Sequence, residues 1–133
     1  MIYSLDTNII SYMLQKNDLV LENYKQEIKK GAECIIPPMV YYEIKRGLLY
    51  KNALVQAKSF DNFCKEFKVG EMNRKAWDKA AQIHAYLRQR GRIIDDGDII
   101  IAAFCLANAF TLVTNNKRHF ENVNGLEFVD WSK

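Results

Sequence analysis

Short apolar runs alternate along the chain with longer stretches in which apolar residues recur every three or four positions. The first pattern predicts buried strands, and the second predicts amphipathic helices. The predicted strands are residues 2–5, 33–36, 67–69, 110–113 and 126–129. The predicted helices are residues 9–14, 18–30, 39–50, 52–64, 73–90 and 99–108. This alternation predicts an α/β fold with a central parallel sheet covered by helices on both faces, in three layers.

Residues between these stretches support the predicted boundaries. Asn17 and Asn73 are placed to act as N-caps of the helices over 18–30 and 73–90, and Gly31 follows the end of the first of these helices. Pro37-Pro38 ends a strand and suits the first turn of a helix. The helix over 99–108 is apolar nearly all round, so we expect it to be buried on most sides.

The size of the chain, 133 residues, predicts one domain over residues 1–133. Such a chain buries roughly two-thirds of the surface that its unfolded form exposes, which is enough for a core without disulfides. No basic segment precedes a long apolar run, and no run approaches the ~18 apolar residues of a membrane span. We therefore expect a cytoplasmic protein with no membrane association.

The three cysteines form no Cys-x-x-Cys pair, and an odd number predicts free thiols in a reducing compartment. The helix over 73–90 is predicted to present an apolar face that includes Trp77 and His84. These two residues and the cysteines are predicted to lie in the core or an interface, with no chemical role. The cysteines are Cys34, Cys64 and Cys105.

Asp6 is the first candidate for chemistry, because it ends the first predicted strand. Open α/β sheets bind ligands at the carboxyl ends of their strands. The segment Asp6-Thr7-Asn8 also consists of residue types that favour helix N-caps, so Asp6 alone is explained equally well as a cap. If other acids converge on it, Asp6 is expected to face the crevice as a ligand, and Thr7 or Asn8 to cap the helix.

Further polar candidates follow at the same predicted edge of the sheet. Glu43 lies about two turns into the helix after Pro37-Pro38, and Asp96 and Asp98 stand at the start of the apolar helix. Asn115-Asn116 follow the strand that ends at residue 113. Each has a simpler explanation. Glu43 is explained as a solvated helix residue, Asp95 or Asp96 as a helix cap, and Asp98 as a charge that favours the helix start. Asn115-Asn116 are explained as a turn after the strand.

Taken together, the acids predict a bound cation. Two carboxylates about 5 Å apart repel by roughly 3 kcal/mol at an effective dielectric of 20. Oxygen-only ligands suit Mg²⁺ or Mn²⁺, whereas His84, His119 and the scattered cysteines make no zinc set. A divalent ion held by acids can activate water and stabilise charge during phosphodiester hydrolysis.

The formal charge of +3 is compatible with a nucleic-acid partner but does not demonstrate one. Basic residues cluster at Lys45-Arg46, at Arg88, Arg90 and Arg92, and at Lys117-Arg118. They either hold an RNA backbone beside the acids or are solvated helix ends, where basic residues complement the helix dipole.

Five stretches, in order along nearly the whole chain, resemble the VapC-type toxins of the PIN-domain ribonuclease family. They are Leu5-Asp6-Thr7-Asn8, the helix that carries Glu43, Gly91-Arg-Ile-Ile-Asp-Asp-Gly-Asp98-Ile-Ile-Ile-Ala-Ala103, Leu112-Val-Thr-Asn-Asn116 through Phe120, and Val129-Asp130-Trp131. The resemblance implies a PIN-like fold and a Mg²⁺- or Mn²⁺-dependent endoribonuclease that acts on RNA, often tRNA. It also implies a homodimer that is neutralised by a VapB-like antitoxin.

The resemblance assigns roles to the candidates one by one. Asp6 and Asp98 correspond to the principal metal ligands, Glu43 assists with metal or water, and Asp96 is a variable additional acid at the metal site. Asn116 completes the catalytic set at a fourth position, where many relatives carry Asp. His119 falls where relatives often have an acid, so a one-metal site is the expectation.

Three other functions compete with that of a metal-dependent ribonuclease. A phospho-acceptor receiver domain needs an acidic pair after its first strand and a lysine after a late strand, but here one Asp and Asn115-Asn116 stand at those places. A phosphatase of the haloacid dehalogenase type needs Asp-x-Asp, whereas this chain has Asp6-Thr7-Asn8. A non-catalytic signalling or RNA-binding domain, whose acids bind a divalent ion only, stays open.

Overall fold

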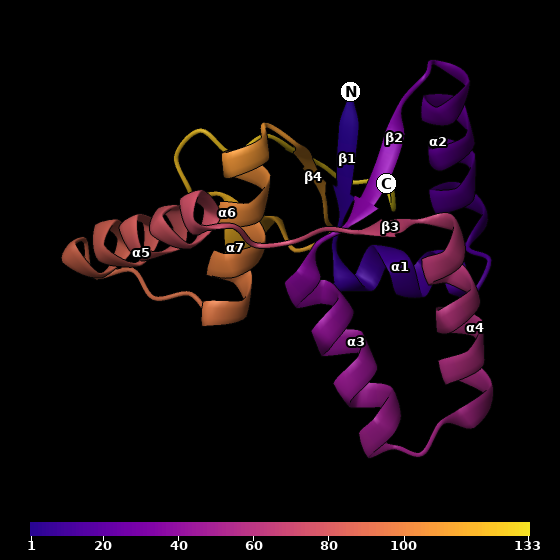
Figure 1. Ribbon diagram of the computed structural model, residues 1–133. Coiled ribbons are helices and arrows are strands. Elements are labelled where there is room, and N and C mark those ends of the chain that lie inside the picture. The colour runs from indigo at the N-terminus through magenta and orange to yellow at the C-terminus, as the bar shows by residue number, and fades with distance from the viewer.

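Five parallel strands form a single sheet in the structure, a computed structural model that describes all residues from 1 to 133 (Figure 1). They are β1 (Ile2–Leu5), β2 (Glu33–Ile36), β3 (Lys68–Val69), β4 (Thr111–Val113) and β5 (Phe128–Val129). Their order across the sheet is β3-β2-β1-β4-β5, and every neighbouring pair is parallel. The predicted α/β fold with a parallel sheet is confirmed.

Seven helices accompany the sheet. They are α1 (Thr7–Leu14), α2 (Asp18–Lys29), α3 (Pro38–Tyr50), α4 (Leu54–Glu66), α5 (Arg74–Gln89), α6 (Asp96–Asn108) and α7 (Lys117–Phe120). The six predicted helices are all present, and β3, β4 and β5 begin later than predicted. The sequence did not predict α7, because four residues with one apolar side chain are too short to show a helical period.

The strand order reverses between β1 and β4. From β1 the chain moves outward to β2 and β3, then returns across β1 to β4 and β5. Because such crossovers are right-handed, the two directions of travel place their helices on opposite faces of the sheet. Figure 1 shows α5 and α6 on one side of β1 and α2 on the other. This reversal is where open α/β sheets form a ligand crevice at their strand ends.

Helix α6 lies in the core, as its apolar composition predicted, and its central residues from 101 to 105 are all buried. The chain approaches this helix closely just beyond β3. A Cβ atom on Gly70 would lie 2.3 Å from Cζ of Phe104, so no larger residue fits there without a shift of the ring. The tight packing fixes α6, and with it the acids of its first turn, against the sheet.

Helix α5 buries a narrower face than predicted. Its buried stripe is Ala76, Ala80, Ile83 and Leu87. Trp77 is 51% exposed and His84 is also exposed, so neither lies in the core of this chain, and the alternative that they lie in an interface stays a prediction. Each follows a stripe residue by one position, which turns its side chain about 100° around the helix.

The cysteines are all free, as predicted, but differ in burial. Cys105 on α6 is fully buried, while Cys34 and Cys64 are only partly so.

Helices α3 and α4 form a hairpin that projects away from the sheet (Figure 1). Nζ of Lys45 and Oδ1 of Asp61 join the two helices at 2.9 Å. Near the turn, four large apolar side chains are well exposed, and we call them the hairpin tip: Leu49, Tyr50, Leu54 and Val55. No helix of the chain combines the length and the apolar character needed to cross a membrane.

Candidate functional site

Asp6 lies at the carboxyl end of β1 and is only 4% exposed. Its backbone N–H donates to the carbonyl of Val113, which extends the pairing with β4 by one residue. Its Oδ1 accepts from the backbone N–H of Thr7 at 2.8 Å, and its Oδ2 accepts from the Thr114 hydroxyl at 2.7 Å. The expectation that Thr7 or Asn8 would cap α1 is therefore wrong: Asp6 is itself the N-cap, because its two oxygens can serve two partners.

Glu43 reaches from α3 to the same region. The hydroxyl of Thr7 donates to its Oε1 at 3.3 Å, which connects it to the first turn of α1. On the other side, a Cβ atom on Gly97 would lie 3.0 Å from its Oε2. Glu43 is thus held between the starts of α1 and α6, and it is not a freely solvated residue.

Asp98 lies in the first turn of α6 and is partly buried. Its Oδ2 is 2.9 Å from Nδ1 of His119, which belongs to α7. Asp95 takes the N-cap position of α6, although its side chain makes no capping hydrogen bond.

The three carboxyl groups affect one another electrostatically. Burial raises the pKa of Asp6 most strongly, and hydrogen bonds from Thr114 and Thr7 oppose it. Burial also raises the pKa of Glu43, and the charges of Asp6 and Asp98 raise it further. The pKa of Asp98 is raised by burial first and by the charge of Asp6, while the imidazole of His119 opposes both. The structure therefore brings Asp6, Glu43 and Asp98 together, as the sequence predicted.

Asp96 and Asn116 join this group less closely. Asp96 is exposed at the start of α6, and Asp95 is the neighbour whose charge acts on Asp98. Asn116 is connected through its backbone, because its N–H donates to the Thr114 hydroxyl at 3.0 Å. The side chain of Asn115 instead lies between Asn8 and Tyr12, with a hydrogen bond to each at 3.1 Å.

Sequence reasoning missed two hydroxyl groups that hold the acids. Thr114 comes directly after a buried strand, and Thr7 comes directly after Asp6. Both therefore lie at the carboxyl edge of the sheet, which is the signal that identifies them in retrospect. Their hydroxyls donate to Asp6 and Glu43, respectively.

The donor chemistry of the three acids fits a hard divalent cation, since every donor is a carboxylate oxygen. A cation would also balance charges whose mutual repulsion is otherwise unfavourable in a partly buried site. No three His, Cys, Asp or Glu side chains already surround a common point at which they could hold an ion.

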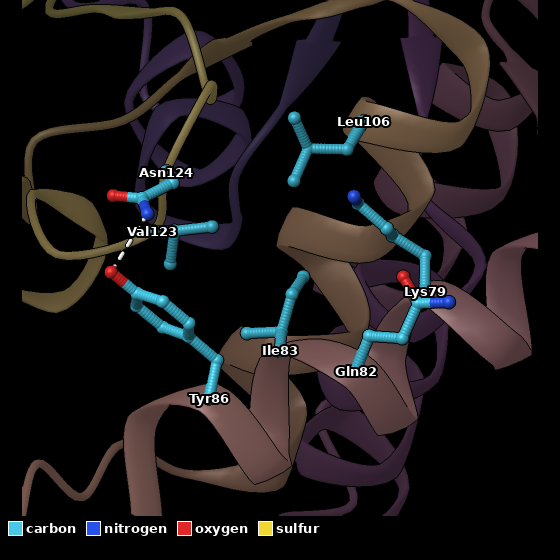
Figure 2. A pocket seen from close by; sticks show the side chains of 7 residues that line it. All are labelled: Lys79, Gln82, Ile83, Tyr86, Leu106, Val123 and Asn124. Atoms are coloured by element: carbon cyan, nitrogen blue, oxygen red, sulfur yellow. Dashed lines mark hydrogen bonds between the residues drawn. The ribbon is translucent and has the colours of Figure 1, made fainter. Parts of the chain in front are cut away.

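A separate pocket of about 260 Å³ lies between α5, α6 and the segment before β5 (Figure 2). Within it, the side-chain amide of Asn124 donates to the Tyr86 hydroxyl at 2.8 Å. Leu106, on its wall, stands about two turns along α6 from Asp98. Its lining contains no acid, so the pocket does not belong to the acid site. The lining residues are Lys79, Gln82, Ile83, Tyr86, Leu106, Val123 and Asn124.

The PIN domain family model matches residues 3–126, a span that contains all the acids described above. The chain belongs to the PIN-domain family. Its sequence is also similar to ribonuclease VapC2 of Rickettsia felis, with 30% identity over 134 residues and 100% of both chains covered. The tRNA(fMet)-specific endonuclease VapC of Shigella flexneri is 29% identical, with 98% of each chain covered. These relatives identify the chain as a VapC-type PIN domain and confirm the resemblance seen in the sequence.

The fold of this PIN domain agrees with that of a solved relative. It superposes with a TM-score of 0.88 on a chain of VapBC2 from Rickettsia felis. That crystal structure contains VapBC2 bound to a DNA fragment from the promoter of VapBC2. The identity is 28%, and the match covers 98% of this chain and 99% of the other. The two chains therefore share the arrangement of strands and helices essentially from end to end.

Proposed function

We propose that this PIN domain is the toxin of a type II toxin–antitoxin pair and hydrolyses RNA phosphodiester bonds with Mg²⁺ or Mn²⁺. The observation that carries the proposal is the meeting of Asp6, Glu43 and Asp98 at the point where the strand order reverses. The ribonuclease and endonuclease names of similar VapC proteins support the reaction class. PIN-domain ribonucleases are metal-dependent as a family, which supports the need for a cation.

The proposed roles of the acids are those that the resemblance to VapC-type toxins implies. Asp6 and Asp98 would act as the principal ligands, and Glu43 would assist with the metal or its water. When bound, the divalent ion supplies a Lewis acid and an activated water for the attack on phosphorus. Asp96, exposed at the rim, adds negative charge, and Asn116 offers an amide to the ion's water or to the substrate.

RNA is expected to approach across a hollow of about 300 Å³ at the ends of β4 and β5, lined in part by Asn115 and by Thr114, whose hydroxyl donates to Asp6. Lys117 and Lys133 line the same hollow and can bind phosphate, although Asp130 is there too. A tRNA substrate is supported by the tRNA(fMet) specificity named for the Shigella flexneri relative.

The proposed protein partner is a VapB-like antitoxin, which the VapBC2 complex of the structural relative supports. Exposed apolar patches on a small protein mark interaction surfaces, and the hairpin tip is such a patch. A homodimer and a cytoplasmic location stay predictions.

The decisive experiment is cleavage of a tRNA pool by the purified chain, with and without Mg²⁺ or Mn²⁺. Asp6→Asn and Asp98→Asn should each abolish cleavage, and Asp78→Asn, at an exposed acid of α5, should leave it unchanged. Cleavage that survives both EDTA and the two site substitutions would refute the proposal. Metal and RNA binding without any cleavage would identify the non-catalytic alternative.

A further inference from the structure

His119 contacts one of the proposed ligands without being an acid itself. Its Nδ1 lies 2.9 Å from Oδ2 of Asp98. The side chain of His119 is 51% exposed and that of Asp98 is 18% exposed, so the contact lies at the mouth of the site. An imidazole can donate from Nδ1 whether it is neutral or charged, so the contact does not depend on a particular protonation state.

Helix α7 holds His119 in a defined place. Phe120, the next residue, is completely buried and anchors the helix in the core. At the other end, the N–H of Asn116 donates to the Thr114 hydroxyl, which in turn donates to Asp6. A continuous path of contacts therefore runs from Asp6 through Thr114 and α7 to Asp98.

We infer that His119 is a positioning residue, which holds Oδ2 of Asp98 and leaves Oδ1 to face the metal. The inference rests on the proposed function, because it takes Asp98 as a ligand. An aspartate side chain has two rotatable bonds, and a fixed donor on one carboxylate oxygen limits the orientations of the other oxygen. Groups that hydrogen-bond to a metal ligand in this way commonly change metal affinity by about 10–100-fold.

Direct ligation by His119 is the competing explanation. In the structure Nδ1 lies 2.9 Å from Oδ2 of Asp98, within the distance that a positioning group requires. The two explanations differ in one measurable property: a nitrogen bound to Mn²⁺ gives a strong ¹⁴N coupling in pulsed electron paramagnetic resonance, and a positioning imidazole does not.

The test measures Mn²⁺ affinity of the full chain by calorimetry, together with the ¹⁴N coupling of the bound ion. His119→Ala should weaken binding by about 10–100-fold. His119→Asn should recover most of that loss, because its amide can donate from a similar place. The matched control is Arg118→Ala, which removes an exposed cationic side chain from the same helix and should change the affinity little.

Each outcome separates the inference from the proposed function. Loss in His119→Ala, rescue by Asn and no strong ¹⁴N coupling in the unaltered chain support the positioning role. Unchanged affinity in His119→Ala, with binding lost in Asp98→Asn, overturns the inference alone. A strong ¹⁴N coupling that His119→Ala removes also overturns it, in favour of direct ligation. Unchanged affinity in Asp98→Asn overturns the ligand assignment on which both rest.

Discussion

The Thr114 hydroxyl donates a buried hydrogen bond to Oδ2 of Asp6 at 2.7 Å, across 108 positions of sequence. The two residues follow β4 and β1, which are neighbours in the sheet. The same hydroxyl accepts from the N–H of Asn116, so it both donates and accepts a hydrogen bond. A carboxylate that is buried and bonded in this way is held in one orientation, and its charge is partly compensated before any metal binds.

Replacing Thr114 by Val should therefore lower both stability and metal affinity. Val has nearly the same shape but removes a donor to a charged group, which costs about 1.5–3 kcal/mol. Chemical denaturation measures the loss, and Mn²⁺ calorimetry measures the binding. Thr111→Val is the matched control, because Thr111 is also buried on β4 and makes no side-chain hydrogen bond. Equal effects of the two substitutions would contradict the role given to Thr114.

A methyl group at Gly97 should disturb Glu43 while leaving the fold intact. The added Cβ would lie 3.0 Å from Oε2 of Glu43 and 3.4 Å from Cε of Met39, so the glutamate must shift. Gly97→Ala should lower RNA cleavage, although alanine favours a helix by about 0.8–1 kcal/mol over glycine. Gly47→Ala, where nothing lies within 4 Å, should stabilise α3 and keep full activity. The idea fails if both variants cleave RNA equally well.

The metal-free protein should become more stable on mild acidification because of Glu43. Burial, followed by the charges of Asp6 and Asp98, raises its pKa in the folded state. A group with a raised folded pKa contributes stability that is fully present below its unfolded pKa and is lost as the pH rises through the folded value. Glu43→Gln removes this contribution, so the variant should gain less stability than the unaltered chain as the pH falls from neutral toward the unfolded value of 4.5.

The measurement for this prediction is thermal unfolding of both chains in EDTA across that range. Saturating Mn²⁺ provides the internal control: protons then compete with the metal for the carboxylates, and the stability should fall on acidification instead. An identical pH dependence of the two metal-free chains would show that the pKa of Glu43 is not raised.

The strands and long helices were predictable because their apolar periods are decided locally. The acids were predictable as a group because the carboxyl ends of parallel strands share one edge. The hydroxyl donors were not, since a threonine carries no periodic signal, and the bond from Thr114 to Asp6 depends on which strands are neighbours. The same limit explains the cap of α1. The sequence analysis treated Asp6 as either a ligand or a cap, whereas its Oδ1 caps the helix and its Oδ2 accepts from Thr114.

Helix α7 shows a different limit. Three polar residues followed by Phe120 give no helical pattern, and the helix is defined by the burial of that one ring and by the Thr114 hydroxyl. The contact from His119 to Asp98 follows from this placement. The exposure of Trp77 was also beyond the sequence, because an apolar pattern does not show how wide a face the neighbouring helix covers.

The strand order has a consequence for the time at which the enzyme becomes active. Asp6, Glu43 and Asp98 are all synthesised before β4, but Thr114 and α7 belong to the last twenty residues. A growing chain therefore carries its acids before it can hold them in place. We expect a chain that ends at Phe110 to cleave no RNA, and cleavage by that fragment would disprove this. The acid site therefore stays incomplete until β4 and α7 have been synthesised and have joined the sheet.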